Sequence, residues 1–467
     1  MDHWSEVSEH KYLYPASEKL RKGATLRHPT EGRKYSRRAF LKAGGGALAG
    51  ASVLGLAGCG SNSASKSGSS GGSKSGTLSF LVWAEPAEEK GFRDIIKAYE
   101  KKNPKAKIDL QVKPFDNYQT LTTRLAAGNA PDLARIQYQE MGRFSSQGAL
   151  VDLSSYLPKN YGDAFTPDLW KAVNYQGKPY GVPQHTDTMA IFYNVNMLKK
   201  VGVTSFPDSP EKAWTWSQFM NLARKLKKAR VAPYPFAVGW QTSAYRWMWF
   251  LFQHGGQLLT NNLKGPMIDN PIGVQTIEFT QNFFKENLVP PSTSIKSNEK
   301  IESLFSNGTI AMMLNGDWLM PFVQDHLKDP WAVTYMIRDK QTASDLGGNA
   351  VAVTKDTKNP ELAADFLKFL ASPEQIKQFC VTAQFIPSRK KLVQEGLDYK
   401  LRPKDMDVFV KQSSTVPPKM AAEQTIPKFG DINQVLEDQL EAAFKTGQSA
   451  KATAKNISSG IKQALGS

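Results

Sequence analysis

Two arginines and a cysteine near the start of the chain have the spacing of groups that take part in export and covalent modification. Arg37 and Arg38 precede a weakly apolar run from Ala43 to Leu56. Paired arginines ahead of such a run are typical of a twin-arginine export signal. The run is shorter than the roughly 20 residues that span a bilayer comfortably. We therefore predict that residues 1–58 direct export by the twin-arginine route and are then removed.

Cys59 follows directly on Leu56-Ala57-Gly58. A small residue before a cysteine resembles the lipobox of bacterial lipoproteins, in which the cysteine thiol is acylated and becomes the mature N-terminus. We predict lipidation of Cys59, which would anchor the protein on the extracytoplasmic face of the cell membrane. Residues 59–76 are rich in serine and glycine, a composition that cannot bury enough apolar surface to fold and should form a flexible tether.

The remaining chain is basic but carries no pattern for a nucleic-acid partner. The formal net charge of the full chain is +16, from 59 basic and 43 acidic residues, and residues 59–467 hold 49 of the basic and 38 of the acidic ones. Lysines are scattered along the predicted helices rather than gathered in one patch, and no DNA- or RNA-binding motif accompanies them. Cys380, the only other cysteine, lies in an apolar helical pattern and should be a buried thiol. We expect a solvated basic surface and no nucleic-acid binding.

Apolar periodicity predicts strands that alternate with helices after the tether. Strands are expected over 78–83, 108–112, 131–136, 189–193, 235–238, 310–314 and 347–353. Helices are expected around 92–99, 118–125, 216–226 and 363–370, followed by two amphipathic helices in the last 35 residues. Thr215 and Gln218 have the spacing of a capping box. Such alternation predicts an α/β protein with parallel strands. Its length favours two lobes.

Polar and aromatic residues at the ends of these strands are the first candidates for a binding site. Trp83 ends the first predicted strand and Glu85 follows it. Ligands of open α/β sheets bind outside the carboxyl ends of the strands. We therefore expect both side chains at the edge of a cleft.

Four stretches of the chain make it recognisable as a family member. It resembles the extracellular solute-binding proteins of carbohydrate ABC importers, the group that includes maltose-binding protein, over about 77–465. The stretches that carry the resemblance are Leu125–Asp132, Gly177–Pro183 with Tyr193-Asn194, Phe305–Met312 with Asn315-Gly316-Asp317-Trp318, and Asn359–Leu370. Their order and spacing together are specific to this family.

The resemblance implies a two-lobe, periplasmic-binding-protein-like fold of class II. Each lobe would hold a central sheet flanked by helices, with hinge strands between the lobes. Lobe 1 would contain residues 77–185 with 345–398, and lobe 2 residues 189–340 with 399–467. A mono- or oligosaccharide would bind in the interlobe cleft and pass to the permease subunits of an ABC importer, and the receptor would act as a monomer without cofactor, metal or catalytic residues.

The resemblance also implies which residues meet the ligand. Aromatic rings stack on the apolar faces of a sugar, and polar groups read its hydroxyls. Trp318 corresponds to a stacking tryptophan, and Trp240 and Tyr245 lie where the family supplies stacking rings. Asp187 corresponds to a hydroxyl-binding acid. Gln139 stands where maltose-binding protein has an acid, so its subsite lacks that charge. Gly348 and Asn349 would offer backbone and amide groups from lobe 1.

Several residues near these positions have ordinary structural interpretations. Trp247 and Trp249 lie in an apolar run and are expected in the core. Asp132 would cap a helix or hold a strand end. Arg135 and Arg246 are expected to form surface ion pairs, although either could meet a phosphate group on a ligand.

Two other functions stay open from the residues. The same fold could bind glycerol-phosphate, a polyamine, a metal complex or another polar solute. A lipid-anchored glycoside hydrolase would need two carboxylates, for which Glu85 and Asp187 are available. No His-Glu-x-x-His motif or phosphate loop occurs, and His185, His254 and His326 have no metal-binding spacing. We therefore expect a binding protein rather than an enzyme.

Overall fold

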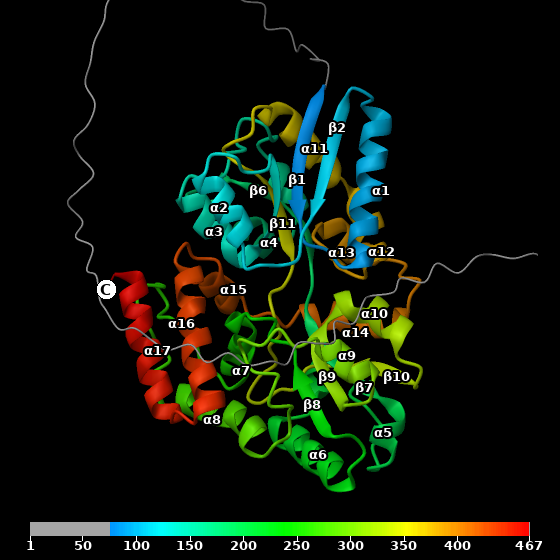
Figure 1. Cartoon of the computed structure of the whole chain (residues 1–467), viewed down its shortest axis with the longest axis vertical. Coiled ribbons are helices and arrows are strands. Elements are labelled where there is room, and N and C mark those ends of the chain that lie inside the picture. The colour runs from blue at the N-terminus through cyan, green and yellow to red at the C-terminus, as the bar shows by residue number, and fades with distance from the viewer. Residues whose placement is uncertain (1–74, 467) are drawn as a thin grey trace, which may run out of the picture. The chain divides into compact units, whose positions relative to one another are not determined.

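The computed structural model describes residues 75–466, which are organised around two β-sheets (Figure 1). The larger sheet has six strands in the order β12-β6-β11-β3-β1-β2. These strands are β1 (Gly76–Val82), β2 (Ala106–Val112), β3 (Leu133–Gln137), β6 (Gly181–Thr186), β11 (Asn349–Val353) and β12 (Ile386–Pro387). The smaller sheet, in the order β10-β7-β9-β8, contains β7 (Met189–Asn194), β8 (Tyr234–Val238), β9 (Ile310–Gly316) and β10 (Trp331–Thr334). A separate hairpin pairs β4 (Asn174–Tyr175) with β5 (Lys178–Pro179). The two-lobe α/β prediction is confirmed.

Helices cover both faces of the larger sheet because its strands are apolar on both sides. Leu78, Phe80 and Val82 of β1 pack in one core cluster, whereas Leu81 contributes to another. The first cluster includes side chains of α1 (Pro86–Lys102), α11 (Pro360–Leu370) and α12 (Pro373–Ala383), and the second those of α2 (Gln119–Ala126), α3 (Tyr138–Ser146) and α4 (Pro167–Ala172). α13 (Lys390–Glu395) follows β12. β1 pairs in parallel with β2 and β3, as the alternation of strands and helices predicts. The prediction of a parallel sheet was wrong for the other half, because β11 pairs antiparallel with β3 and β6, and β12 pairs antiparallel with β6. β11 enters this sheet from the segment that follows β10 of the smaller sheet, not from a helix that crosses over the larger sheet.

The smaller sheet is likewise enclosed by helices. They are α5 (Val195–Lys199), α6 (Trp216–Ala229), α7 (Met248–Gln253), α8 (Pro271–Lys285), α9 (Ile301–Ser306), α10 (Met320–His326), α14 (Pro403–Ser413), α16 (Phe429–Glu441) and α17 (Ala450–Leu465), with α15 (Pro418–Gln424) before α16. Short helical turns are η1 (Tyr161–Ala164), η2 (Pro210–Lys212), η3 (Ala244–Trp247), η4 (Asp317–Leu319) and η5 (Ala442–Thr446). α6 begins with the predicted capping box, in which the side chains of Thr215 and Gln218 each bond to the other's backbone N–H.

Two segments that pass between the sheets lie side by side. One joins β6 to β7 and the other joins β10 to β11. The Thr188 hydroxyl lies 2.7 Å from the Ser344 hydroxyl and donates to the Asp345 carbonyl at 3.1 Å. Thr186 Oγ1 donates to the Gly347 carbonyl at 3.0 Å. These buried bonds tie both segments together at the level where the sheets meet, so a change in one segment is transmitted to the other.

Several predictions about buried residues are confirmed. Trp247, Trp249 and Cys380 are fully buried. Asp132 holds a strand end, because its Oδ2 accepts bonds from the Ser79 backbone and hydroxyl, both at 2.8 Å. No helix within 75–466 is long and apolar enough to cross a membrane. The predicted export arginines Arg37 and Arg38, the predicted lipidation site Cys59 and residues 59–74 of the predicted tether lie outside the described residues.

Candidate functional site

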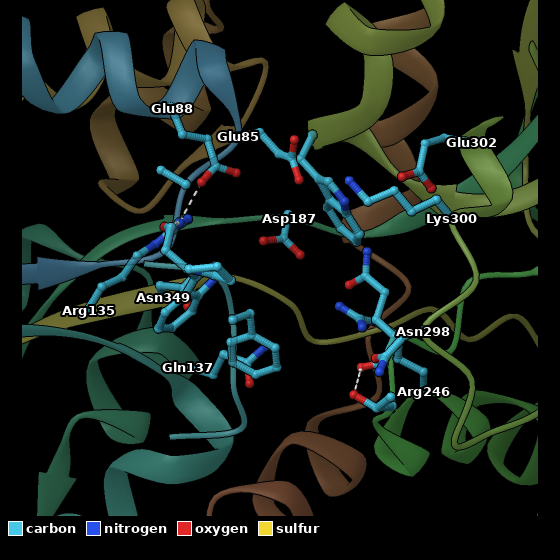
Figure 2. A pocket seen from close by; sticks show the side chains of 18 of the residues that line it. Glu85, Glu88, Arg135, Gln137, Asp187, Arg246, Asn298, Lys300, Glu302 and Asn349 are labelled. Atoms are coloured by element: carbon cyan, nitrogen blue, oxygen red, sulfur yellow. Dashed lines mark hydrogen bonds and ion pairs between the residues drawn. The ribbon is translucent and has the colours of Figure 1, made fainter. Parts of the chain in front are cut away.

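A cavity of about 550 Å³ is lined by residues of the larger sheet, of the loops and helical segments that follow or precede strands of the smaller sheet, and of a segment that joins the two sheets. Trp83 and Glu85 follow β1, and Gly348 and Asn349 lie at the start of β11. Asp187 comes from the segment between β6 and β7. Figure 2 shows its carboxylate near the centre of the pocket. The cavity has the size of an ordinary small-molecule site and is reached from strand ends, as in other open α/β sheets.

Seven of the nine predicted ligand-binding residues line this one cavity. They are Trp83, Glu85, Asp187, Tyr245, Trp318, Gly348 and Asn349. Tyr245 lies on η3, which follows β8, and Trp318 lies on η4, which follows β9. Residues of both lobes are therefore gathered around one space, because their strands all end toward it.

The structure does not bring the other two predicted residues to this cavity. Gln139 is buried on α3, where its Nε2 donates to the Leu346 carbonyl at 2.5 Å, and it lines a smaller cavity of about 110 Å³. Trp240 is 3% exposed, and its Nε1 donates to the Thr293 carbonyl at 3.1 Å. The Trp240 ring packs against Phe250 and Phe444. An indole whose single donor is satisfied and whose ring lies in the core cannot stack on a ligand here.

The ring of Trp318 lies against the backbone of Gly316, a residue of the motif Asn315-Gly316-Asp317-Trp318. A Cβ at Gly316 would come within 1.7 Å of Trp318 Cζ3. Glycine is therefore required at this position so that the indole can lie against the backbone. Another part of the ring meets Arg246, whose Cζ lies 5.4 Å from the ring centroid. The motif Asn315-Gly316-Asp317-Trp318 thus sets the position of an aromatic ring at the cavity wall.

A buried ion pair replaces the surface pair predicted at Arg135. Arg135 is 2% exposed, and its Nη1 lies 2.5 Å from Glu88 Oε2 on α1. The same nitrogen donates to the Trp83 carbonyl at 2.6 Å, and the guanidinium lies 5.0 Å from the Trp83 ring centroid. The prediction of a surface ion pair was wrong because α1 and β1 cover this side chain. Arg135 thus fixes Trp83, the residue that follows β1, at the edge of the cavity.

Arg246 is also buried, contrary to the prediction. It is 4% exposed, and its Nε lies 3.6 Å from Oδ2 of Asp345, which is fully buried. Its Nη1 donates to the Trp240 carbonyl at 3.3 Å. The residues next to Arg246 in the sequence do not reveal that it is buried, because the 344–348 segment that covers it lies about 100 residues away in the chain.

Buried charges set the protonation of Asp187. Burial raises the pKa of Asp187 to about 6, while the charges of Arg246 and Arg135 and a hydrogen bond from the Gly348 backbone oppose this rise. His185 Nε2 lies 3.4 Å from Asp187 Oδ2. Burial and then the charge of Arg135 lower the pKa of His185 well below its ordinary value, so the imidazole is neutral. Asp187 can therefore present a carboxylate to the cavity at neutral pH.

Residues that the sequence reasoning missed complete the lining. They include Phe115, Gln137, Asn298, Lys300 and Glu302. Gln137 ends β3, so the same strand-end rule that identified Trp83 would have identified it. Asn298 and Lys300 come from the loop before α9, which carries no periodic pattern. Figure 2 shows that Lys300 and Glu302 approach the pocket from the side opposite Arg135.

Unsatisfied polar atoms in the lining indicate that the cavity suits a hydrogen-bonding ligand. Arg135 Nε, Arg246 Nε and Asn349 Oδ1 are buried and have no hydrogen-bond partner among residues 75–466. Such groups cost free energy unless a ligand or water satisfies them. Within the described chain, no group of three histidine, cysteine or acidic side chains could hold a metal ion. The arrangement offers rings and hydrogen-bonding groups from both lobes.

Gly347→Ala is expected to weaken ligand binding by about fivefold or more. The new Cβ would lie 1.7 Å from Asp187 Oδ1, so the carboxylate must leave its place at the cavity centre. Overpacking of this kind costs about 1–3 kcal/mol. Isothermal titration calorimetry of the variant, with a saccharide that the wild-type protein binds, measures the effect. Gly265→Ala is the matched control, because its Cβ meets only the Thr260 side chain at 3.6 Å, and unchanged binding in Gly347→Ala would contradict the position of Asp187.

Comparison with known proteins places the chain in a family. The model of the bacterial extracellular solute-binding proteins matches residues 83–377. The maltodextrin-binding protein MdxE of Bacillus subtilis is 25% identical over 436 residues, which cover 91% of this chain and 98% of that protein. The arabinooligosaccharide-binding protein of Bacillus subtilis is 26% identical over 347 residues, or 69% of this chain and 74% of that protein.

Solved structures share the fold. The GacH receptor of Streptomyces glaucescens, determined unliganded and in complex with acarbose, matches with a TM-score of 0.74 at 20% identity. The match covers 84% of this chain and 99% of the receptor. The family match covers strands of both sheets and all seven of the predicted residues that line the cavity, and by this match the chain belongs to the bacterial extracellular solute-binding protein family.

Proposed function

We propose that this protein captures a mono- or oligosaccharide in the cavity between its lobes and delivers it to the permease subunits of an ABC importer. The observation that carries the proposal is the pairing of aromatic rings with buried, unsatisfied hydrogen-bonding groups in one cavity. Trp83, Tyr245 and Trp318 supply the rings, and Asp187 and Asn349 supply polar groups beside them. A sugar needs both, since it has apolar C–H faces and a rim of hydroxyls.

The relatives support a saccharide as the ligand. The two Bacillus subtilis relatives bind maltodextrin and arabinooligosaccharide by their names, and the GacH receptor was solved with acarbose. Ligand contacts from both lobes would favour the closed form, because a ligand shifts a conformational equilibrium only through contacts that differ between the two states. In the proposed division, lobe 1 contains 77–185 with 345–398 and lobe 2 contains 189–340 with 399–467.

The receptor would act at the extracytoplasmic face of the cell membrane. Arg37 and Arg38 support export by the twin-arginine route, and the small residue before Cys59 supports a lipid anchor. A lipoprotein also occurs among the relatives, the maltooligosaccharide-binding protein of Streptococcus pneumoniae. We propose that the anchored protein is a monomer. Its tether would be the serine- and glycine-rich residues from Cys59 up to β1, one residue shorter than predicted because Gly76 already belongs to that strand.

The charges of the cavity favour a neutral sugar over a phosphorylated solute. Arg135 is held by Glu88 at 2.5 Å, and Arg246 is held by Asp345 at 3.6 Å. Both buried arginines thus already face acids, and the two lysines of the lining, Lys113 and Lys300, are outnumbered by the acids Glu85, Asp187, Glu299 and Glu302. A phosphate site needs uncompensated donors instead. A hydrolase is not favoured either, since the family consists of binding proteins, and the acids near the cavity fit hydroxyl recognition.

A thermal-shift screen of the purified protein tests the proposal. The probes are maltotriose, arabinotriose, glycerol-3-phosphate and spermidine. A ligand that binds only the folded state at a hundredfold excess over its Kd stabilises by about 2.7 kcal/mol, and the melting temperature rises accordingly. We expect a rise with a saccharide. A rise with glycerol-3-phosphate or spermidine alone, or release of shorter sugars from a bound saccharide, would overturn the proposal.

A further inference from the structure

Arg246 links the lobe that carries it to both of the side-by-side segments that join the two sheets. It lies on η3, after β8 of the smaller sheet. Its Nε lies 3.6 Å from Oδ2 of Asp345, which belongs to the segment between β10 and β11. Arg246 is also the strongest opposing charge at Asp187, which belongs to the segment between β6 and β7. One guanidinium therefore faces two acids that lie at the junction of the lobes.

The same guanidinium lies against the two aromatic rings of the smaller-sheet lobe that line the cavity. Arg246 Cζ lies 5.1 Å from the Tyr245 ring centroid and 5.4 Å from the Trp318 ring centroid. At these distances a guanidinium is attracted to a ring face, and the attraction grows when the cation is removed from water. Since Arg246 is 4% exposed, the contact restricts both rings.

Asp187 is surrounded by titratable groups from several elements. They are Arg246 on η3, Arg135 on β3, His185 on β6, Glu88 on α1, Asp317 on η4, Asp345 on the adjoining segment, Tyr138 on α3 and Tyr245 on η3. Arg135 is already held at 2.5 Å by Glu88. His185 is neutral, because burial and the charge of Arg135 lower its pKa. Arg246 is consequently the cation on which the charge of Asp187 depends most.

We propose that Arg246 is a positioning residue for saccharide capture: it holds the Tyr245 and Trp318 rings and keeps Asp187 charged as a hydrogen-bond acceptor. This inference rests on the proposed function of the cavity. Arg246 acts through three other side chains, so its role differs from that of a residue that only fills space in the core.

The charge of Asp187 makes capture depend on pH in a defined direction. Its pKa is raised to about 6, mainly by burial. A carboxylate accepts hydroxyl donors at both oxygens, whereas the protonated acid loses part of that capacity. Affinity is therefore full above this pKa and falls as the pH is lowered through it. Removing Arg246 takes away a favourable charge and raises the pKa of Asp187.

Two variants separate the effect of Arg246 from that of its neighbour. In Arg246→Gln, the midpoint of the Asp187 titration should rise by about 1 pH unit. In Asp345→Asn, it should stay close to the wild type, because burial raises the pKa of Asp345 to about 7, so Asp345 is already mostly protonated where Asp187 titrates. Arg246→Lys keeps the charge and should restore the midpoint but not the ring contacts, since an ammonium lacks the planar guanidinium. Arg224→Gln is the matched control, because Arg224 is an exposed arginine that pairs with Glu286 on the surface.

Carboxyl NMR of the full chain with ¹³Cγ-labelled aspartate measures these midpoints directly in ligand-free protein. The Asp187 signal is assigned by its loss in Asp187→Asn. A rise in Arg246→Gln, with no shift in Asp345→Asn or Arg224→Gln, supports the proposal. Equal midpoints in wild type and Arg246→Gln would overturn it. If Arg246→Gln does not fold, Arg246→Lys still decides, since an unchanged saccharide affinity in that variant would show that the guanidinium does not hold the two rings.

Titration calorimetry with maltotriose and arabinotriose between pH 5 and 8 supplies the second readout. Loss of wild-type affinity below about pH 6, with a midpoint that follows the NMR midpoint in each variant, supports the positioning role. Wild-type binding whose pH dependence is the same in Arg246→Gln would overturn this role and leave the proposed function intact. Failure of both saccharides to bind at any pH would overturn the saccharide function and the positioning role with it.

Discussion

Trp318→Ala is expected to weaken saccharide binding by about thirtyfold or more. The indole stands at the cavity wall over Gly316, so it offers a rigid apolar face to a sugar ring. Truncation of a buried aromatic anchor commonly costs about 2 kcal/mol or more, and each 1.4 kcal/mol changes a dissociation constant tenfold. Titration calorimetry with the saccharide that raises the melting temperature most measures the loss.

Trp214→Ala is the control for this change. Trp214 is also a half-buried tryptophan of the smaller-sheet lobe, but it packs against Phe206 and does not line the cavity. We expect the saccharide affinity of Trp214→Ala to stay within a factor of about two of the wild type, since Trp214 does not line the cavity and its truncation removes no ligand contact. Equal losses in both variants would show that the effect of Trp318→Ala comes from general destabilisation and not from stacking.

Glu88→Ala is expected to lower the free energy of unfolding by about 3–5 kcal/mol. Glu88 is 5% exposed and Arg135 is 2% exposed, so removal of the carboxylate leaves a buried cation without its counter-ion. Breaking a buried pair by deleting one partner has this cost, whereas replacing both partners by apolar side chains is often neutral. Urea-induced unfolding followed by tryptophan fluorescence measures the change.

A second pair on the same helix provides the matched control. Lys90 and Asp94 lie 2.6 Å apart on the surface of α1, with exposed side-chain fractions of 66% and 32%. Asp94→Ala should cost less than about 1 kcal/mol, because water and salt screen an exposed pair. The double variant Glu88→Leu with Arg135→Met should recover most of the stability lost in Glu88→Ala. A Glu88→Ala loss no larger than that of Asp94→Ala would contradict the burial of this pair.

Much of the fold was predictable because it depends on local pattern. The apolar spacing of Phe92, Ile95, Ile96 and Tyr99 indicated α1, and the structure buries all four residues. Alternating strands and helices indicated a parallel sheet, which is right for β1, β2 and β3 but wrong for β11 and β12, which pair antiparallel with their neighbours. β10 and α8 were not predicted. β10 has four residues, too few to show a clear alternation of apolar and polar side chains. In α8, apolar and polar residues are mixed along the helix without a clear apolar stripe.

The site was predictable where a strand end or a motif identified it. Trp83 was found because it ends a strand, and Trp318 because it follows Asn315-Gly316-Asp317. Gln139 and Trp240 were assigned by correspondence with the family alone, and the structure holds both in buried hydrogen bonds outside the main cavity. Correspondence along the chain identifies a segment, but the rotation of a side chain into a cavity or into the core depends on neighbours from elsewhere in the sequence.

The sequence by itself determined the alternation of strands and helices, the family and the strand ends that face the cavity, since these depend on period and motif within a few residues. Only the tertiary structure decided that Arg135 and Arg246 are buried, that Asp187 and Asp345 share the charge of Arg246, and that the loop before α9 reaches the cavity. The physical reason is that burial and electrostatic environment are set by contacts between segments far apart in the chain, such as those that enclose Arg246 at the junction of the two lobes.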